Sequence, residues 1–145
     1  MKIYLAGSIA GGREFAKQIA LISQCLEGMG HDVLTKNNVV QTKDLNKYHD
    51  NLKNRKLIFN RDKKWILNCD AVVMEVSVYS HGVGYEHAIA EIAGKPVLIL
   101  RHDSLKKNRY SAFLDGTGYA KLTFSFYNEK NVREILNKFF EKLSG

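Results

Sequence analysis

The sequence predicts an α/β fold: a single doubly wound domain over residues 1–145, with helices on both faces of a five-stranded parallel sheet. Short apolar runs rich in β-branched residues alternate along the chain with segments of helical periodicity. One glycine-rich turn directly follows the first apolar run, and another follows the third. We expect the strand order 2-1-3-4-5 of flavodoxin- or Rossmann-like sheets, which brings both turns to the crevice where ligands bind.

The first half of the chain supplies two of the expected strands. Residues 2–6 are predicted to form a buried strand that ends at a turn over residues 7–12. A helix follows, because apolar side chains then recur at helical spacing. Residues 31–35 are expected to form the short second strand, and the polar stretch from 37 to about 56 a loop and a helix. The apolar stripe of the first helix consists of Phe15, Ile19, Ile22, Leu26 and Met29.

The next helix is predicted over residues 57–68, and it raises a question about one acidic residue. Ile58, Trp65 and Ile66 form its apolar stripe, and position 62 belongs to the same stripe. The residue there is Asp62. A carboxylate on an inward face costs desolvation free energy unless it is paired or used, so Asp62 is a candidate functional residue.

The central strand and its following helix carry the second candidate. The run 71–74 is apolar and rich in β-branched residues, as in a buried strand. Small residues then line the turn, and Glu86 is expected in the first turn of the helix behind them. Gly94 and Pro96 end that helix. Tyr85, Ala88, Ile89 and Ile92 are expected to share one apolar face of that helix.

The last part of the chain completes the alternation. Residues 97–100 are predicted as a buried strand, 104–114 as a short helix and 121–126 as an edge strand. The final helix has one clear apolar stripe, and Asn131 with Glu134 resembles a capping box at its start.

Composition narrows the class of protein. Twenty-two Lys and Arg against fifteen Asp and Glu give a net charge of +7, which favours anionic ligands such as nucleotides. The aromatic residues form no pattern typical of binding to a nucleic-acid polymer. No apolar run is long enough to span a bilayer, and the apolar stretch before Gly7 is too short for a signal peptide. With Cys25 and Cys69 read as reduced core thiols, we expect a cytoplasmic protein that acts away from membranes.

Asp62 and Glu86 together suggest cleavage of a glycosidic bond. Apolar surroundings are expected to raise the pKa of Asp62, whereas free amides at a helix N-terminus are expected to lower the pKa of Glu86. A neutral acid and an anion are what such a cleavage needs. A structural interpretation stays open, with Glu86 satisfying the helix dipole and Asp62 in a buried ion pair.

Other kinds of site find little support. No His has metal-ligand spacing with another His, Cys or acid, so neither a metal nor a cofactor is expected. The turn over residues 7–12 matches neither a Walker A loop nor the dinucleotide fingerprint.

At these residues the chain resembles the 2'-deoxynucleoside 5'-phosphate N-hydrolases, relatives of the nucleoside 2-deoxyribosyltransferases. The similarity runs from residue 3 to about 114 and is most specific in GVGYE, which ends at Glu86, preceded by an Asp 24 residues earlier. Its segments are Ile3-Tyr4-Leu5-Ala6-Gly7-Ser8-Ile9, Gly11-Gly12-Arg13-Glu14, Asp62-x-x-Trp65-Ile66, Asp70 to Val76, Ser80 to Glu86, and Tyr110-Ser111-Ala112.

The resemblance implies a role for each matching position. Glu86 falls on the nucleophile and Asp62 on the acid. Ser111 falls on a serine that reaches the phosphate site of the partner in a homodimer. Ala10 departs from the family, whose hydrolases often carry Arg there. The implied substrate-binding positions are Tyr4, Gly7, Ser8, Ile9, Gly11, Ser80, Gly82, Gly84 and Ser111.

The implied activity is hydrolysis of the N-glycosidic bond of 2'-deoxynucleoside 5'-monophosphates to free base and 2-deoxyribose 5-phosphate, a reaction of nucleotide metabolism. Two alternatives stay open. A nucleoside 2-deoxyribosyltransferase would exchange bases, with a second base replacing water. A non-catalytic protein on the same fold would bind the nucleotide without turnover.

Overall fold

The computed structural model describes residues 1–8, 14–36, 52–109 and 111–145. Five parallel strands form one sheet in the order β2-β1-β3-β4-β5, which confirms the predicted fold class and strand order. The strands are β1 (Lys2–Ala6), β2 (Asp32–Val33), β3 (Ala71–Glu75), β4 (Val97–His102) and β5 (Leu122–Tyr127).

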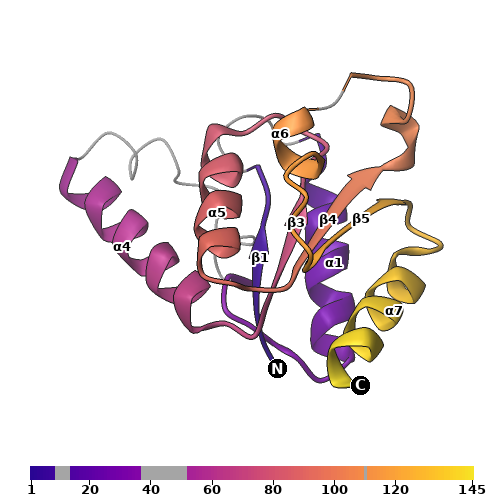
Figure 1. The fold of residues 1–145 in the computed structure, drawn as a ribbon, viewed down its shortest axis with the longest axis horizontal. Coiled ribbons are helices and arrows are strands. Elements are labelled where there is room, and N and C mark those ends of the chain that lie inside the picture. The colour runs from indigo at the N-terminus through magenta and orange to yellow at the C-terminus, as the bar shows by residue number, and fades with distance from the viewer. Residues whose placement is uncertain (9–13, 37–51, 110) are drawn as a thin grey trace.

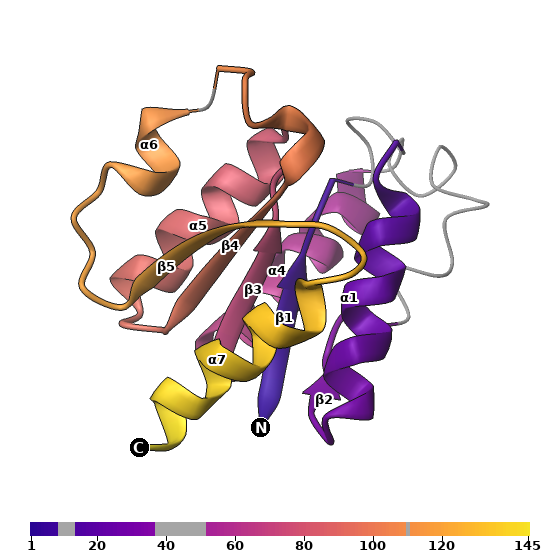
Figure 2. The ribbon, with the colours of Figure 1, turned by 90° about the vertical axis from the view of Figure 1, so that its right-hand side faces the viewer.

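Helices cover both faces of the sheet (Figures 1 and 2). One face carries α1 (Ala16–Gly28) and α7 (Val132–Ser144), and the other carries α4 (Leu52–Asn68) and α5 (His81–Ile92). Two short helices follow β4, the 3₁₀ helix η2 (Asp103–Leu105) and α6 (Ala112–Asp115). No helix in the described ranges is long and apolar enough to cross a membrane.

The central strands are apolar throughout because both faces of the sheet are covered. In β1, Ile3 and Leu5 belong to the core layer under α1 and α7, whereas Tyr4 and Ala6 belong to the layer under α4 and α5. All five residues of β3 are buried. The alternation along β1 therefore directs Tyr4 toward the helix pair α4 and α5.

The sheet topology positions a crevice at one edge. β1 lies between β2 and β3, and Ala6 pairs with Met74, so the two strands end side by side. The chain leaves β1 at Gly7 and Ser8, and it leaves β3 toward the start of α5. In parallel α/β sheets ligands bind where neighbouring connections diverge in this way. Of the turn over residues 7–12, only Gly7 and Ser8 lie within the described residues.

Several element boundaries differ from the sequence predictions. The helix expected from residue 57 begins at Leu52, and the second strand covers only Asp32–Val33. The single helix predicted over residues 104–114 is wrong, because two short helices, η2 and α6, stand in its place.

The capping box at the start of α7 is also wrong. The Oδ1 atom of Asn131 accepts the backbone N–H of Asn128 at 2.7 Å and makes no cap contact inside the helix. Glu134 instead accepts a hydrogen bond from Lys138 one turn further on.

α5 does not pack against the sheet through its apolar stripe of residues 85, 88, 89 and 92. Val83, His87 and Ala90 are its buried residues, whereas Tyr85 is 60% and Ile92 88% exposed. The apolar residues 85, 88, 89 and 92 do share a helical stripe, but the sheet meets the neighbouring stripe. α5 therefore presents an apolar face outward.

Candidate active site

Glu86 projects from the second turn of α5, toward α4. The helix begins at His81, one residue after the N-cap Ser80, whose Oγ accepts the backbone N–H of Val83. Gly82 and Gly84 thus lie inside the first turn, and the prediction that Glu86 occupies that turn is wrong. Since His87 faces the sheet, the preceding position points to the side of the helix.

Asp62 projects from α4 between Ile58 and Ile66, one turn away in each direction. Ile66 is fully buried and Ile58 partly buried, so the structure confirms that position 62 shares the inward stripe. Asp62 is paired with its neighbour Arg61, whose Nε and Nη2 atoms each lie 2.9 Å from Asp62 Oδ1. The side chain of Asp62 is 17% exposed and that of Arg61 41%, so the pair is not the buried one that the structural interpretation required.

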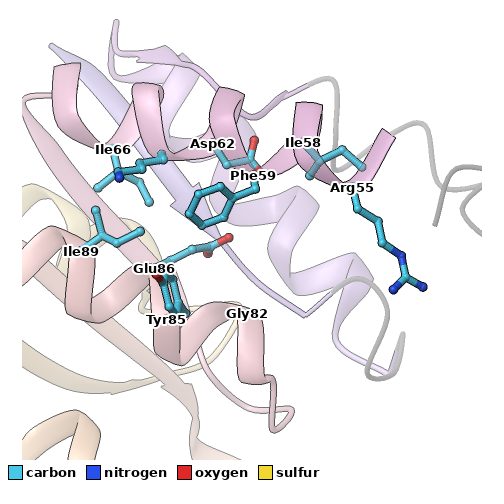
Figure 3. A pocket seen from close by; sticks show the side chains of 10 residues that line it. Arg55, Ile58, Phe59, Asp62, Ile66, Gly82, Tyr85, Glu86 and Ile89 are labelled. Atoms are coloured by element: carbon cyan, nitrogen blue, oxygen red, sulfur yellow. The ribbon is translucent and has the colours of Figure 1, made fainter. Parts of the chain in front are cut away.

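The two carboxylates line one cavity between α4 and α5 (Figure 3). Its volume is about 460 Å³, enough for a small organic ligand. Apolar side chains form most of its wall, and two cations, Arg55 and Lys63, also line it. Of the described residues, those that line it are Arg55, Ile58, Phe59, Asp62, Lys63, Ile66, Gly82, Tyr85, Glu86 and Ile89.

Tyr4 connects the sheet to this pocket. Its hydroxyl is hydrogen-bonded to the Glu86 carboxylate across the interface between β1 and α5. Burial raises the pKa of Tyr4, and the nearby carboxylates of Glu86 and Asp62 raise it further. Tyr4 therefore stays a neutral hydrogen-bond donor that orients Glu86.

Burial raises the pKa of Glu86 to about 7. The negative charge of Asp62 adds to the rise, and the hydrogen bond from Tyr4 offsets part of it. The prediction of a lowered pKa for Glu86 is wrong, because it assumed a place in the first turn among free amides. In the second turn the apolar pocket dominates.

The glycines near the end of β1 and at the start of α5 differ in how much space surrounds them. A Cβ on Gly7 would lie 2.6 Å from Ile19 Cδ1, so a larger residue there would have to displace the Ile19 side chain of α1. A Cβ on Gly84 would meet nothing within 4 Å, and one on Gly82 only Ser80 Oγ at 3.7 Å. The chain itself leaves this space open on the first turn of α5.

The serines differ in how their hydroxyls are used. Ser8 is 5% exposed, and its Oγ has no hydrogen-bond partner among the described residues. Ser80 is occupied as the N-cap acceptor of α5, although its hydroxyl hydrogen can still be donated. Ser111 precedes α6 and makes no side-chain cap contact, and it does not line the pocket of its own chain. Ile9, Gly11 and Ala10 lie outside the described residues.

The pocket contains residues that the sequence analysis did not select. Phe59 and Tyr85 form an edge-to-face pair with ring centroids 5.9 Å apart, and Ile89 lines the wall beside them. The stripe 85, 88, 89 and 92 signalled these residues, but the outward orientation of α5 was not anticipated. Among the described residues, no group of three or more His, Cys, Asp or Glu side chains could hold a metal ion.

A buried polar cluster lies on the other face of the sheet, apart from the pocket. Glu75 accepts hydrogen bonds from the hydroxyls of Ser77 and Tyr127, and burial raises its pKa. Tyr127 belongs to the core layer under α1 and α7. Glu75 therefore contacts groups of the protein and does not line the pocket.

Comparison with known proteins decides the family. A sequence profile of the nucleoside 2-deoxyribosyltransferases matches residues 3–133. The chain belongs to this family.

Two relatives of this family member align over nearly the whole of both chains. A Danio rerio protein named 5-hydroxymethyl-dUMP N-hydrolase is 35% identical over 146 residues, which cover 99% of each chain. A Nematostella vectensis protein, whose name places it with the 2'-deoxynucleoside 5'-phosphate N-hydrolases, is 38% identical over 146 residues, 98% of this chain and 95% of its own. The resemblance predicted from the motifs is confirmed.

Two solved structures share the fold of this family member at 20% identity. A Clostridium botulinum CMP N-glycosidase covers 94% of this chain and 99% of its own, with a TM-score of 0.66. A Bacillus psychrosaccharolyticus 2-deoxyribosyltransferase covers 92% and 90%, with a TM-score of 0.67.

Proposed function

We propose that the chain is an N-glycosidase that hydrolyses 2'-deoxynucleoside 5'-monophosphates to free base and 2-deoxyribose 5-phosphate. The observation that carries this proposal is the pair of carboxylates, Asp62 and Glu86, in the wall of one apolar pocket. Glycosidic cleavage needs two carboxyl groups beside one substrate bond. The names of the relatives, both N-hydrolases, support the same reaction class.

In this proposal Glu86 is the nucleophile. Its carboxylate attacks C1' while the bond from C1' to the base nitrogen breaks, and Asp62 transfers a proton to the departing base. Water then adds to C1', its proton passes to Asp62, and Glu86 is released as a carboxylate. The hydrogen bond from Tyr4 holds Glu86 in orientation for both steps.

The apolar part of the pocket suits the base. Phe59 and Tyr85 offer aromatic surface, and Ile58 and Ile89 offer aliphatic surface, around the two carboxylates. The phosphate would lie toward the N-terminus of α5, where free amides and the hydroxyls of Ser8 and Ser80 favour an anion.

Incubation with a panel of deoxynucleotides, ribonucleotides and nucleosides tests the activity by release of free base. 5-Hydroxymethyl-dUMP is the first substrate to try, because a relative carries that name. Release of both base and 2-deoxyribose 5-phosphate is expected. Transfer of the sugar to an added second base would favour a deoxyribosyltransferase, and tight binding without release a non-catalytic nucleotide-binding protein.

Deoxynucleoside monophosphates are expected to be better substrates than the corresponding deoxynucleosides. The missing Arg at position 10 removes one charge-assisted phosphate contact, worth roughly 1.5–3 kcal/mol of binding, so the preference should be smaller than with Arg. Ala10→Arg should lower KM for the monophosphate and leave the nucleoside nearly unaffected. Equal cleavage of nucleosides and monophosphates by the wild type would contradict the phosphate assignment.

A homodimer that shares Ser111 across its interface is part of the proposal. The outward face of α5 is apolar, with Tyr85 and Ile92 exposed, and Phe113 of α6 is 89% exposed. Leu114, next to Phe113, packs against the core layer under α5. A second copy is a suitable cover for this surface, and it would bring its Ser111 hydroxyl to a pocket that Ser111 of the same chain does not line.

Mixing two impaired variants tests the sharing of Ser111. Ser111→Ala is expected to lose phosphate preference and Glu86→Gln to lose turnover. A mixed dimer then has one complete site if Ser111 acts across the interface, so activity on monophosphates should recover toward half of the wild-type level per mixed dimer. Ile92→Lys in both partners should prevent dimer formation, checked by sedimentation, and with it the recovery. If proven mixed dimers show no recovery, Ser111 does not act in the site of the partner subunit.

A further inference from the structure

The contact between Arg61 and Asp62 is unusual for adjacent residues of a helix. Their side chains normally diverge, yet both Nε and Nη2 of Arg61 reach Asp62 Oδ1 at 2.9 Å. Trp65, one turn further along α4, supports the folded-back guanidinium, whose Cζ lies 4.7 Å from the ring centroid. Arg61 itself does not line the pocket.

Both contacts fall on one oxygen of Asp62. Oδ2 takes no part in this ion pair, so Arg61 anchors the Asp62 carboxylate through Oδ1.

The ion pair between Arg61 and Asp62 also affects the ionisation of Glu86. Two carboxylates in one apolar pocket disfavour each other's ionisation. Among the described residues, the charged and titratable groups around Glu86 are Tyr4 from β1, Tyr85 from α5, and Arg55, Asp62 and Lys63 from α4, with Arg61 paired to Asp62. Arg61 is the cation paired directly with the competing carboxylate, whereas Lys63 lies over the Phe59 ring at 5.9 Å.

We propose that Arg61 is a positioning residue of this site: it holds the Asp62 carboxylate through Oδ1 and offsets its negative charge, so that Glu86 can ionise beside it. The catalytic meaning of this inference rests on the function proposed above, but the effect of Arg61 on Glu86 does not require turnover to be measured.

Carbon-13 NMR titration of the Glu side chains tests the electrostatic part directly, with Glu86 assigned by the loss of its signal in Glu86→Gln. Arg61→Gln should raise the titration midpoint of Glu86 by about one pH unit, because the cation that pairs with Asp62 is lost and the charge of Asp62 is no longer offset. Lys64→Gln is the matched control: it removes the same charge from an exposed position of the same helix, and should move the midpoint by less than about 0.2 unit.

Two further variants sharpen the test. Arg61→Lys keeps the charge and should restore most of the wild-type midpoint. In an Asp62→Asn background the midpoint should fall, and Arg61→Gln should then have at most half of its former effect, since Arg61 has lost its partner. An Arg61→Gln midpoint equal to that of Lys64→Gln, or an undiminished effect in the Asp62→Asn background, overturns the proposal.

The activity profile separates this inference from the proposed function. In Arg61→Gln the acid limb of kcat/KM should move upward with the NMR midpoint, with about a tenfold loss near pH 6 and KM within twofold at pH 8. An active wild type whose acid limb is unmoved by Arg61→Gln refutes the role of Arg61 alone. A wild type that releases no base from any deoxynucleotide refutes the proposed function, and the NMR result still decides the electrostatic role.

Discussion

Replacing Glu86 with Gln is expected to lower the rate of base release by about a thousandfold or more, because a covalent nucleophile is lost. The fold should persist. Gln preserves the shape of the side chain and can still accept the hydrogen bond from Tyr4, but its amide oxygen does not form the ester with C1'. Burst-phase and steady-state measurements with 5-hydroxymethyl-dUMP provide the readout. A well-folded Glu86→Gln enzyme with near wild-type kcat would place the nucleophile elsewhere.

Chemical rescue distinguishes a missing nucleophile from general damage. Glu86→Ala leaves room in the pocket for a small anion such as azide or formate. Azide should attack C1' in place of Glu86 as Asp62 protonates the base, giving free base and a 1-azido sugar phosphate. Asp62→Ala offers the matched control, since an external anion does not replace a proton donor in this step. Rescue of Asp62→Ala rather than Glu86→Ala would reverse the two roles.

The same substitution at Glu86 is expected to stabilise the protein at neutral and higher pH. The pKa of Glu86 is raised to about 7 in the folded protein from 4.5, so the folded state binds more protons than the unfolded state between these values. The wild type therefore loses stability as pH rises through this window, and Glu86→Gln does not. The expected gain above pH 7 is about 1–3 kcal/mol in the free energy of unfolding, with none below pH 4. Urea unfolding at pH 4 and pH 8 measures it.

Replacing Asp62 with Asn should lower cleavage of ordinary deoxynucleotides by roughly a hundredfold to ten-thousandfold, the range found for loss of general acid catalysis. The loss should depend on the leaving base. 7-Methyl-2'-deoxyguanosine 5'-monophosphate already carries a cationic base, which leaves without a proton from the enzyme. Its cleavage, corrected for the uncatalysed rate, should fall less than tenfold.

Glu86→Gln should abolish cleavage of both the ordinary and the methylated substrate, because the nucleophile is needed for each. Equal losses on the two substrates in Asp62→Asn would show that Asp62 acts by binding or positioning and not as an acid. The fold should tolerate the change, since the ion pair with the 41% exposed Arg61 contributes at most about 1 kcal/mol.

The hydrophobic pattern and the order of the motifs were enough to predict the sheet, the inward position of Asp62 and the family from the sequence. Strands read as apolar runs because both faces of the sheet are covered, and their alternation with helices limits the topology to the order that is observed. The inward position of Asp62 followed from its spacing of four residues from Ile58 and Ile66. The family followed from motifs that run in order along most of the chain.

Only the tertiary structure decided how α5 is turned and what surrounds Glu86. Its stripes 83, 87, 90 and 85, 88, 92 are both mainly apolar, so helical periodicity alone does not choose between them. Packing buried His87 and left Ile92 exposed. The pKa of Glu86 likewise depends on desolvation by α4 and on Tyr4, which are distant in sequence, and not on the neighbouring glycines. Periodicity reports which side chains share a face, whereas burial and electrostatics depend on what the rest of the chain brings to that face.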